Sequence, residues 1–352
     1  MAEDVKIVDE NNLEEEVELV EETSENQQSE EPSSSLNLPE EPKEPNKVLR
    51  VLRSQKGWLW MIPMLACLAI FTFWPIINTL ISAFRVNYVP FNLQKPDDGF
   101  GFQNFATAVT DGYFLNSLFN TFFFTFVSVP LSTLIALLIS VALSSIKKLQ
   151  GLYQSILFLP YLTNALAIGA VFYTMFQVIG TTSNVETWGL INTIFGTHVH
   201  WVDADASTWA MRFVVIFYEV WAGLPFKILI LFGALQNVNK QYYDAAKIDG
   251  ASKGTVLWKI TVPLISPMIS YLLTTGIIGG FKAYSAVVGI FGPNMGPKSD
   301  YEMGTIVGLI YRYIGDGGNQ IGVASAASLV LFAIIMVITL INQQISKRRV
   351  HY

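Results

Sequence analysis

Six long stretches that carry almost no charged residues constrain the fold of this chain more than any other feature. Four of these stretches contain no charged residue: 58–84, 112–146, 149–185 and 317–346. The other two, 213–238 and 260–297, contain three charged residues between them: Glu219, Lys227 and Lys282. A helix needs about 20 apolar residues to cross the hydrocarbon core of a bilayer, and backbone in lipid must satisfy its hydrogen bonds internally. No stretch alternates as a barrel strand does. We therefore expect an all-α integral membrane protein with six transmembrane helices, near residues 58–83, 116–144, 153–179, 212–236, 263–289 and 321–345.

The charged residues are unevenly distributed between an N-terminal tail and the rest of the chain. The whole chain is 14% charged, well below the roughly 25% of soluble domains, and has a net charge of −6. Residues 1–46 hold 16 acids and 2 bases, which leaves 12 acids and 20 bases for the remainder. We expect the tail to be disordered, because it cannot bury enough apolar area to offset its ordering entropy. The tail could be a solvated segment with no essential role, or it could have a regulatory or tethering role. The single cysteine, Cys67, excludes a disulfide-stapled domain.

The bases between the uncharged stretches predict the orientation of the chain. Thirteen lie on one side: Lys47, Arg50, Arg53, Lys56, Lys147, Lys148, Lys240, Lys247, Lys253, Lys259, Lys347, Arg348 and Arg349. The other side has five bases: Arg85, Lys95, Arg212, Lys298 and Arg312. It also has nine acids: Asp97, Asp98, Asp111, Glu186, Asp203, Asp205, Asp300, Glu302 and Asp316. Since cytoplasmic loops carry the excess of lysine and arginine, both termini are expected in the cytoplasm.

No motif for catalysis is present, and we do not expect an enzyme. The chain has no phosphate-binding lysine loop, no HExxH, no GxSxG and no paired-cysteine metal motif. His198 and His200 lie near Asp203 and Asp205 in an outer loop, but His-x-His alone is a weak metal signal and no metal site is expected. Composition also excludes a nucleic-acid binder built on a basic globule. We expect a conduit or a receptor, and any energy must come from another subunit.

The most specific pattern lies between the fourth and fifth predicted helices, in residues 240–263. It predicts a short helix, a glycine corner and a second short helix closed by proline. Asp244 suits a helix N-terminus, Ala245 and Ala246 keep one face small, Gly250 permits positive φ, and Pro263 ends the second helix. The result would be a compact amphipathic unit with some exposed apolar surface.

These residues resemble the EAA motif of the integral-membrane permeases of ABC importers, EAA-x3-G-x9-I-x-LP. The matching positions are Asp244, Ala245, Ala246, Gly250, Ile260 and Pro263, with Asp244 in place of Glu and Val262 in place of Leu. Asp249-Gly250-Ala251 is similar to the carbohydrate-importing branch of that family. Further matches are Asn104-Phe105, Asn120-Thr121, Phe158-Leu159-Pro160, Gly189-Leu-Ile-Asn192 and Gly322-Val-Ala-Ser-Ala326. The resemblance covers roughly residues 57–346 and points to a maltose-type first permease.

The resemblance implies a type I ABC importer fold in a bacterial inner membrane. Its divisions would be a cytoplasmic tail (1–46), a first helix with an outer loop (47–111), a five-helix permease core (112–346) and a basic C-terminus (347–352). The partners implied are a second homologous permease, two cytoplasmic ATPase subunits and an extracytoplasmic solute-binding protein. The coupling loop 240–263 would dock on the ATPase. ATP and Mg would bind the ATPase, and no cofactor is expected on this chain.

The candidate substrate contacts come from the few charges at membrane depth and the aromatic residues around them. Ionisable residues there generally face a cavity or a partner, and sugar rings stack on aromatic faces. The candidates are Tyr218, Glu219, Trp221, Lys227, Phe281, Lys282 and Tyr284. A structural salt bridge involving Glu219 is the alternative to a substrate role, and Lys282 could neutralise Glu219 or favour an acidic ligand.

Other functions remain as alternatives. Within transport, the solute could be a polyol, glycerol phosphate, an acidic sugar or an oligopeptide. An ion channel or secondary carrier would show inverted repeats or a ladder of charges, and the sequence shows neither. A non-transporting scaffold or sensor would leave the pattern in residues 244–263 unexplained.

Overall fold

The computed structural model describes residues 60–89, 99–146, 148–182, 185–298, 301–315 and 320–349. The acidic tail therefore lies outside the described residues, as do Lys47, Arg50, Arg53 and Lys56. Contacts divide the chain into two units, 1–66 and 67–352. Of the first unit only residues 60–66 are described, and they are helical. Apart from the start of the helix Trp60–Phe84, the elements described below belong to the second unit.

Four helices are long and apolar enough to cross a membrane: Trp60–Phe84, Phe114–Ser145 (α5), Thr208–Gln236 (α9) and Ile321–Ser346 within α16 (Ile321–Arg349). They confirm the helices predicted near 58–83, 116–144, 212–236 and 321–345. The first contains a short π-helical turn, Ala69–Phe73 (η1), followed by α3 (Trp74–Phe84).

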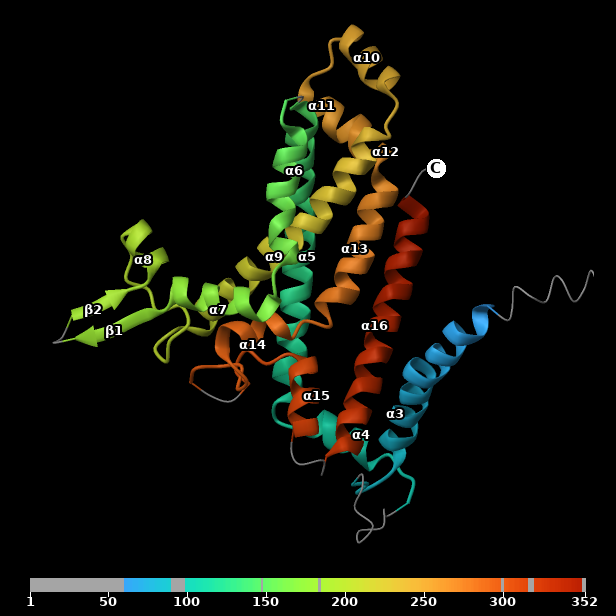
Figure 1. The fold of residues 1–352 in the computed structure, drawn as a ribbon, viewed down its shortest axis with the longest axis vertical. Coiled ribbons are helices and arrows are strands. Elements are labelled where there is room, and N and C mark those ends of the chain that lie inside the picture. Colours follow the sequence, from blue (N-terminus) through green and yellow to red (C-terminus); the bar gives the residue numbers. More distant parts are fainter. Residues whose placement is uncertain are drawn as a thin grey trace, which may run out of the picture. The chain divides into compact units, whose positions relative to one another are not determined.

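The remaining elements are shorter and are shown in Figure 1. Before α9 they are α4 (Gln103–Thr110), α6 (Gln150–Phe158), η2 (Leu159–Leu162), α7 (Ala165–Phe176), β1 (Val178–Thr182), β2 (Val185–Trp188) and α8 (Leu190–Phe195). After α9 they are α10 (Lys240–Ile248), α11 (Lys253–Val256), η3 (Leu257–Thr261), α12 (Val262–Leu264), α13 (Ser266–Gly280), α14 (Ser285–Phe291) and α15 (Ile306–Gly315).

Two spans predicted as continuous helices, 153–179 and 263–289, are broken, so those predictions were wrong in detail. The segment Gln150–Leu162 meets α7 at 94°. Asn164 lies at the break, where its side chain accepts hydrogen bonds from the backbone N–H groups of Leu166 and Ala167. An asparagine in this position satisfies the free donors of a new helix, so the chain can start α7 in a new direction. Hydropathy does not detect such a break, because both arms are apolar.

The second break separates Lys253–Leu264 from α13 by 70°. Proline lacks a backbone N–H and restricts its preceding residue, and Pro263 and Pro267 flank this break. A further interruption follows Gly280, so the end of the predicted span forms the separate helix α14. Counting each bent pair as one span gives up to six spans.

Small and polar residues bring the helices close together. α5 packs along α9 and α13, while α16 packs against α3, α4 and α15. Between α7 and α14 the backbones nearly touch, because a Cβ on Gly169 would lie 2.6 Å from the Cα of Gly289. Close approach at small residues is the usual basis of helix association in lipid, where burial of apolar area gives no net driving force.

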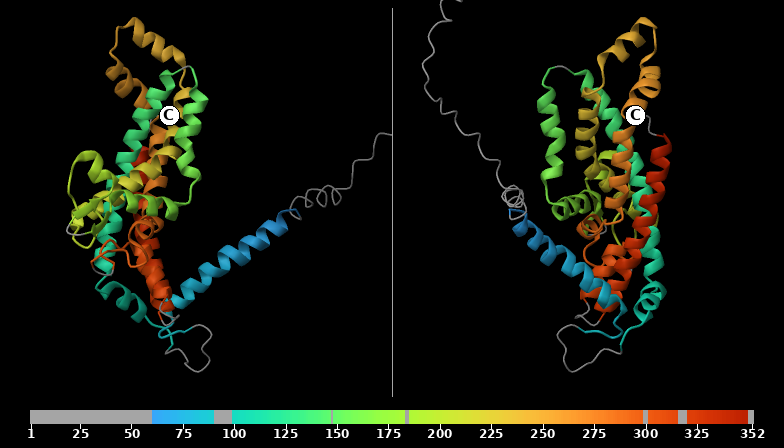
Figure 2. Two further views of the ribbon diagram at one scale, coloured as in Figure 1. Left: turned by 60° about the vertical axis from the view of Figure 1, so that its left-hand side comes forward. Right: turned by 90° about the vertical axis from the view of Figure 1, so that its right-hand side faces the viewer.

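A small antiparallel sheet, β1 with β2, adjoins α7 and α8 in the segment before α9 (Figure 1). This sheet was not anticipated from the sequence. At the other end of the chain's long helices, α10 and α11 project together beyond α5, α6 and α13 in every view (Figures 1 and 2). The C-terminal end of α16 points toward the same side.

Candidate coupling segment and transport path

The segment from α10 to α12 forms a corner that is closed by local hydrogen bonds; we call residues 240–264 the α10–α12 corner. The first helix ends at Ile248, and Gly250 follows with a φ of +67°. The Gly250 N–H donates to the Lys247 carbonyl (3.1 Å), and the Ala251 N–H donates to the Ala246 carbonyl (2.9 Å). This pair of bonds defines a Schellman motif, in which glycine adopts the left-handed conformation at low cost. The predicted glycine corner is therefore present.

Asp244 does not lie at the helix N-terminus, as the sequence had suggested. α10 begins four positions earlier, at Lys240, and Asn239 is its N-cap, with Oδ1 accepting from the Gln241 N–H (3.0 Å). Asp244 is exposed and pairs with Lys247 one turn later, at 2.9 Å between Nζ and Oδ1. Its carboxylate therefore forms an ion pair on the exposed face of α10 and does not cap the start of the helix. An asparagine before the periodic residues was the signal that could have placed the true N-cap.

The second arm of the corner also has a side-chain cap. Ser252 Oγ accepts from the Thr255 N–H (3.2 Å) at the start of α11. Thr261, which is buried, reaches back to the hydroxyl of Tyr243 at 3.4 Å and so links the two arms. Ile260 is partly buried, while Pro263 is exposed in the last turn before the 70° bend. The predicted second helix closed by proline is present, with a π-helical turn inside it.

Of the matched motif residues, Ala246 faces inward with 5% of its surface exposed, whereas Ala245 and Asp249 are exposed and Ala251 is partly buried. The corner also exposes large apolar side chains that the motif does not contain. Ile248 is 86% exposed, Trp258 56% and Tyr242 53%. Apolar groups held on a rigid, otherwise polar surface mark a site of protein contact. The sequence signal for them was an isoleucine and a tryptophan among lysines, which predicted exposed apolar surface without naming the residues.

Lys227, a candidate for the transport path, is turned toward α5. The side chain is buried, and its ammonium donates to the Val129 carbonyl at 3.2 Å and to the Ser132 hydroxyl. These contacts join α5 to α9 and give Lys227 a structural partner.

Glu219 differs from Lys227 although both lie on α9. Its carboxylate is partly buried and interacts electrostatically with Lys227, but among the described residues it forms no hydrogen bond or ion pair. The salt bridge considered as its structural alternative is therefore not observed in the described part of the chain. Its neighbour Tyr218 is buried, with its hydroxyl donating to the Ala165 carbonyl at the start of α7 (2.9 Å). Trp221 is partly buried beside Phe172, with ring centroids 5.5 Å apart.

The other three candidates lie in the interruption after α13. Phe281 is fully buried and packs edge-on against Phe122 (4.9 Å between centroids). Lys282 is exposed, and Tyr284 stacks on Tyr311 at 4.4 Å. The irregular backbone here gives Lys282 a direction that a continuous helix would not. Of the seven candidates, Glu219 and Lys282 are charged and lack a direct partner in the described residues.

A polar network near the N-terminal end of α5 was not predicted from the sequence, in which Arg212 and Glu302 indicated only the orientation of the chain. We call it the Glu302 network: Asn116, Asn120, Thr208, Arg212 and Glu302. Both asparagine amides donate to the Glu302 carbonyl, at 3.1 and 2.9 Å, and Asn120 also donates to the Gly304 carbonyl (3.2 Å). Arg212 donates to the Asn120 carbonyl oxygen, and Thr208 to the Glu302 carboxylate. The network anchors the segment before α15 to α5 and α9.

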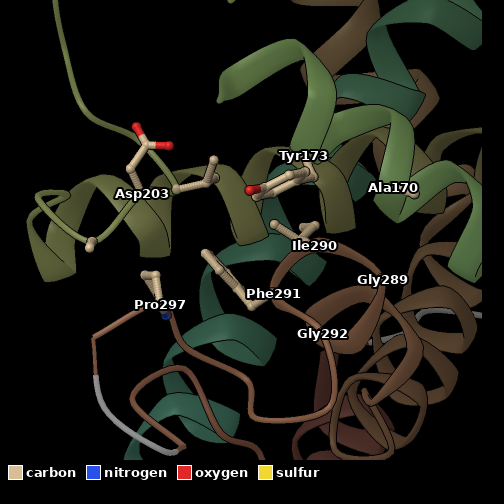
Figure 3. A pocket seen from close by; sticks show the side chains of 10 residues that line it. Ala170, Tyr173, Asp203, Gly289, Ile290, Phe291, Gly292 and Pro297 are labelled. Carbon is tan, nitrogen blue, oxygen red and sulfur yellow. The ribbon is translucent and has the colours of Figure 1, made fainter. Parts of the chain in front are cut away.

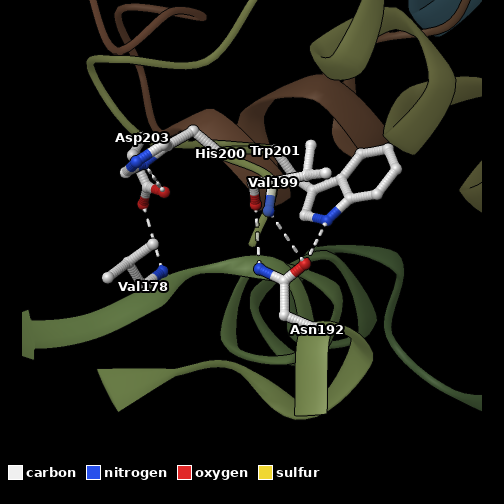
Figure 4. A network of polar contacts seen from close by, with 6 residues as sticks. All are labelled: Val178, Asn192, Val199, His200, Trp201 and Asp203. Carbon is white, nitrogen blue, oxygen red and sulfur yellow. Dashed lines mark hydrogen bonds and ion pairs between the residues drawn. The ribbon is translucent and has the colours of Figure 1, made fainter. Parts of the chain in front are cut away.

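A cavity of about 510 Å³ lies between α7, α14 and the loop before α9 (Figure 3). Tyr173 extends into it, opposite Phe291 and Pro297, while Gly289 and Gly292 leave its wall open. Asp203 also lines the cavity, but its carboxylate already has two partners. It accepts a hydrogen bond from the Val178 N–H and contacts His200 Nδ1, each at 3.3 Å (Figure 4).

The outer loop that contains the His-x-His pattern is organised by an asparagine. Asn192 donates to the Val199 carbonyl (2.8 Å) and accepts from the Trp201 indole (3.0 Å), as Figure 4 shows. His198 packs edge-on against Trp188. In the described part of the chain, no three His, Cys, Asp or Glu residues gather as metal ligands would.

Comparison with known proteins is consistent with this architecture. A relative from Mycoplasma pneumoniae, named a probable ABC transporter permease protein MG188 homolog, is 30% identical over 280 residues, 79% of this chain and 81% of its own. The arabinooligosaccharides transport system permease protein AraP of Bacillus subtilis is 29% identical over 294 residues, 82% of this chain and 88% of its own. A bacterial alginate ABC transporter, solved with an alginate pentasaccharide-bound periplasmic protein, has the same fold with a TM-score of 0.68. It is 20% identical, and the match covers 85% of this chain and 96% of that one.

The family model described as "Binding-protein-dependent transport system inner membrane component" matches residues 104–351. The match begins at Asn104, whose amide donates to the Ala83 and Arg85 carbonyls and ties α4 to the end of α3. It includes the α10–α12 corner, both broken spans and α16. The chain therefore belongs to the family of binding-protein-dependent transport system inner membrane components, the multi-pass permeases of ABC transporters.

Proposed function

We propose that this chain is one permease of a heterodimeric pair in an ATP-driven importer of sugars or oligosaccharides. The α10–α12 corner would transmit the movement of a cytoplasmic ATPase to the membrane helices. A solute-binding protein outside the membrane would deliver the ligand, and two ATPase subunits would bind the ATP and Mg. This assignment gives the chain a transport role without catalysis of its own.

The observation that carries the coupling role is the combination of rigidity and exposed apolar surface in the corner. Ile248 and Trp258 are exposed although apolar, and the backbone between them is fixed by the Schellman motif and by the Ser252 cap. A surface that pushes on another protein needs both features. Burying one large apolar side chain contributes about 1.5–3 kcal/mol, and a fixed corner avoids an ordering cost on docking.

The orientation proposed from the charges places the corner in the cytoplasm. Lys240, Lys247, Lys253 and Lys259 all lie in it. Because lysine and arginine are in excess in cytoplasmic loops, this end would face the ATPase. α16 ends on the same side as the corner (Figure 1), so the C-terminus would be cytoplasmic as well, and by the same rule so would the acidic tail.

Sugars are the proposed solute class because AraP is named for arabinooligosaccharide transport and because aromatic residues lie close in the sequence to Glu219 and Lys282. Trp221 and Tyr284 remain candidate contacts, and Glu219 and Lys282 are the candidates for polar recognition. Phe281 is a weak candidate, because its ring is fully buried against Phe122. Lys227 is the weakest candidate, because its ammonium is engaged by α5.

Reconstitution tests the proposal. The full chain would be purified with its partner ATPase and second permease, placed in liposomes, and assayed for uptake of labelled sugars with the cognate binding protein. We expect uptake that requires ATP, the binding protein and all subunits. Gly250→Pro should abolish ATPase co-purification, since proline cannot adopt φ of +67°. Uptake by this chain alone without ATP would refute the proposal, and ATP-dependent uptake of glycerol phosphate or a polyol in place of sugars would correct the solute.

A further inference from the structure

A second cavity, of about 810 Å³, lies between the α10–α12 corner and the ends of α5 and α9. Its walls come from the last turn of α5, the start of α6, the end of α9, and the segment from α10 to η3. The volume is within the usual range of ligand sites, roughly 300–1,000 Å³. No motif residue of the corner other than Ala251 lines it, so the cavity is not the exposed face proposed for the ATPase.

The charge of this cavity is entirely positive. Lys240, Lys247 and Lys253 line it, and no Asp or Glu is among its lining residues. Lys247 shares its charge with Asp244, which lies outside the lining. Lys240 and Lys253 form no ion pair among the described residues. Three lysines from α10 and α11 therefore line one space, and two of them have an ammonium group without an ion-pair partner in the described part of the chain.

The remaining lining is amphipathic. Ser144, Ser145 and Gln150 contribute polar groups, while Val141, Leu235 and Val256 contribute apolar surface. α5 and α9 are long and apolar enough to span a membrane, with 32 and 29 residues. Because about 20 residues cross the hydrocarbon core, their ends extend to the level of the lipid head groups. A ligand here must therefore match lysines at one part of the cavity and an apolar wall at another.

We propose that this cavity binds the head group of an anionic phospholipid, with the phosphate among Lys240, Lys247 and Lys253 and the glycerol and first acyl carbons against Val141 and Leu235. Basic pockets between helices on the cytoplasmic side of membrane proteins bind such lipids. A free phosphate shares the anionic chemistry but leaves the apolar wall unused. A bound lipid joins the corner to the ends of α5 and α9, so that the lipid composition of the membrane affects how firmly the corner is held.

The test uses the full chain, assembled with its partners and exchanged into nanodiscs that contain equal parts phosphatidylglycerol and phosphatidylcholine. Native mass spectrometry after mild delipidation measures the ratio of the two lipids retained. We expect enrichment of phosphatidylglycerol in the wild type. One basic residue near anionic lipid contributes about 1 kcal/mol, a factor of about five, so Lys240→Gln and Lys253→Gln should each reduce the enrichment about fivefold and the triple glutamine variant should eliminate it.

Three matched variants identify the cause. Lys259→Gln removes a lysine from the same corner but outside the cavity, and it should leave the enrichment unchanged. Replacing the three cavity lysines by arginine keeps the charge and should keep the enrichment, which assigns the effect to the positive charge at these positions. Ser144→Trp fills the cavity without changing its charge and should lower retention of phosphatidylglycerol.

Three outcomes would overturn the proposal: unchanged enrichment in the triple glutamine variant, an equal loss in Lys259→Gln, or displacement of the lipid by millimolar inorganic phosphate. The last outcome would assign the cavity to a soluble phosphate compound. Lipid retention is measured without transport, so this proposal can fail while the proposed function holds, and the reverse is equally observable.

Discussion

The α10–α12 corner and the Glu302 network hold the chain in opposite ways. The corner is closed by contacts between residues at most 18 positions apart: Ala251 to Ala246, Ser252 to Thr255, and Thr261 to Tyr243. The network joins residues that are 92 to 186 positions apart, such as Asn120 with Arg212 and Asn116 with Glu302. The shape of the corner therefore depends on local contacts within residues 240–264. The network can form only after α5, α9 and the segment before α15 have packed together.

This difference separates effects on the whole fold from effects on one surface. A change in the network should lower global stability, because it releases elements that are distant in sequence. A change in the corner should leave the membrane helices intact and alter only the local shape or the binding surface. The following substitutions test that separation, from the largest expected effect on stability to the smallest.

Asn120→Ala should destabilise the chain most. The amide is fully buried and serves two backbone carbonyls and Arg212. Its removal leaves buried polar groups without partners, at about 1–3 kcal/mol each, and we expect a total near 3 kcal/mol. Thermal unfolding in detergent measures it. Asn237→Ala is the control, because Asn237 is exposed and bonds only within its helix; equal Tm values for the two variants would contradict the account.

Lys227→Ala should cost about 2 kcal/mol, since it empties space between α5 and α9 and removes hydrogen bonds to Val129 and Ser132. Glu219→Gln is nearly isosteric and removes no hydrogen bond or ion pair observed among the described residues, only the electrostatic interaction with Lys227, so its Tm should fall much less than that of Lys227→Ala. If Glu219 recognises the solute, the same variant raises the KM for uptake. A large loss of stability in Glu219→Gln, with KM unchanged, would reverse these assignments.

Gly250→Ala should cost about 1 kcal/mol, confined to the corner, because a residue with a Cβ is strained in the left-handed region. Gly254→Ala provides the matched control: neither new Cβ meets an atom within 4 Å, and only Gly250 has positive φ. Hydrogen exchange at the Ala251 amide, which closes the corner, should accelerate about fivefold in the first variant alone. Equal exchange rates in both variants would show that φ does not determine the stability of this turn.

Ile248→Ser should change stability least, by less than about 0.5 kcal/mol, since exposed positions without partners tolerate substitution. The side chain is 86% exposed. A Tm within error of the wild type confirms that Ile248 belongs to a surface and not to the core. A marked fall in Tm would place it in a packed site that the structure does not contain.

The same contrast explains what the sequence could and could not predict. Four uninterrupted spans followed from long stretches with almost no charged residues, and the glycine corner followed from Gly250 and its neighbours. The breaks at Asn164 and Ile265 were missed because an apolar helix and two apolar arms have the same hydropathy. Arg212 and Glu302 were interpreted only as loop charges, because no local pattern shows that residues 90 positions apart share one asparagine. The roles of the candidate substrate residues remain predictions.

The central claim is that the exposed face of the α10–α12 corner docks the ATPase. Its most direct test is the affinity of the partner ATPase for the full chain with Ile248→Ser, compared with Ile194→Ser. Ile194 is also exposed, at 64%, but lies in α8, far along the chain from the corner. The account predicts at least tenfold weaker binding for Ile248→Ser, about 1.4 kcal/mol, and unchanged binding for Ile194→Ser. Wild-type affinity in Ile248→Ser, or an equal loss in Ile194→Ser, would contradict it.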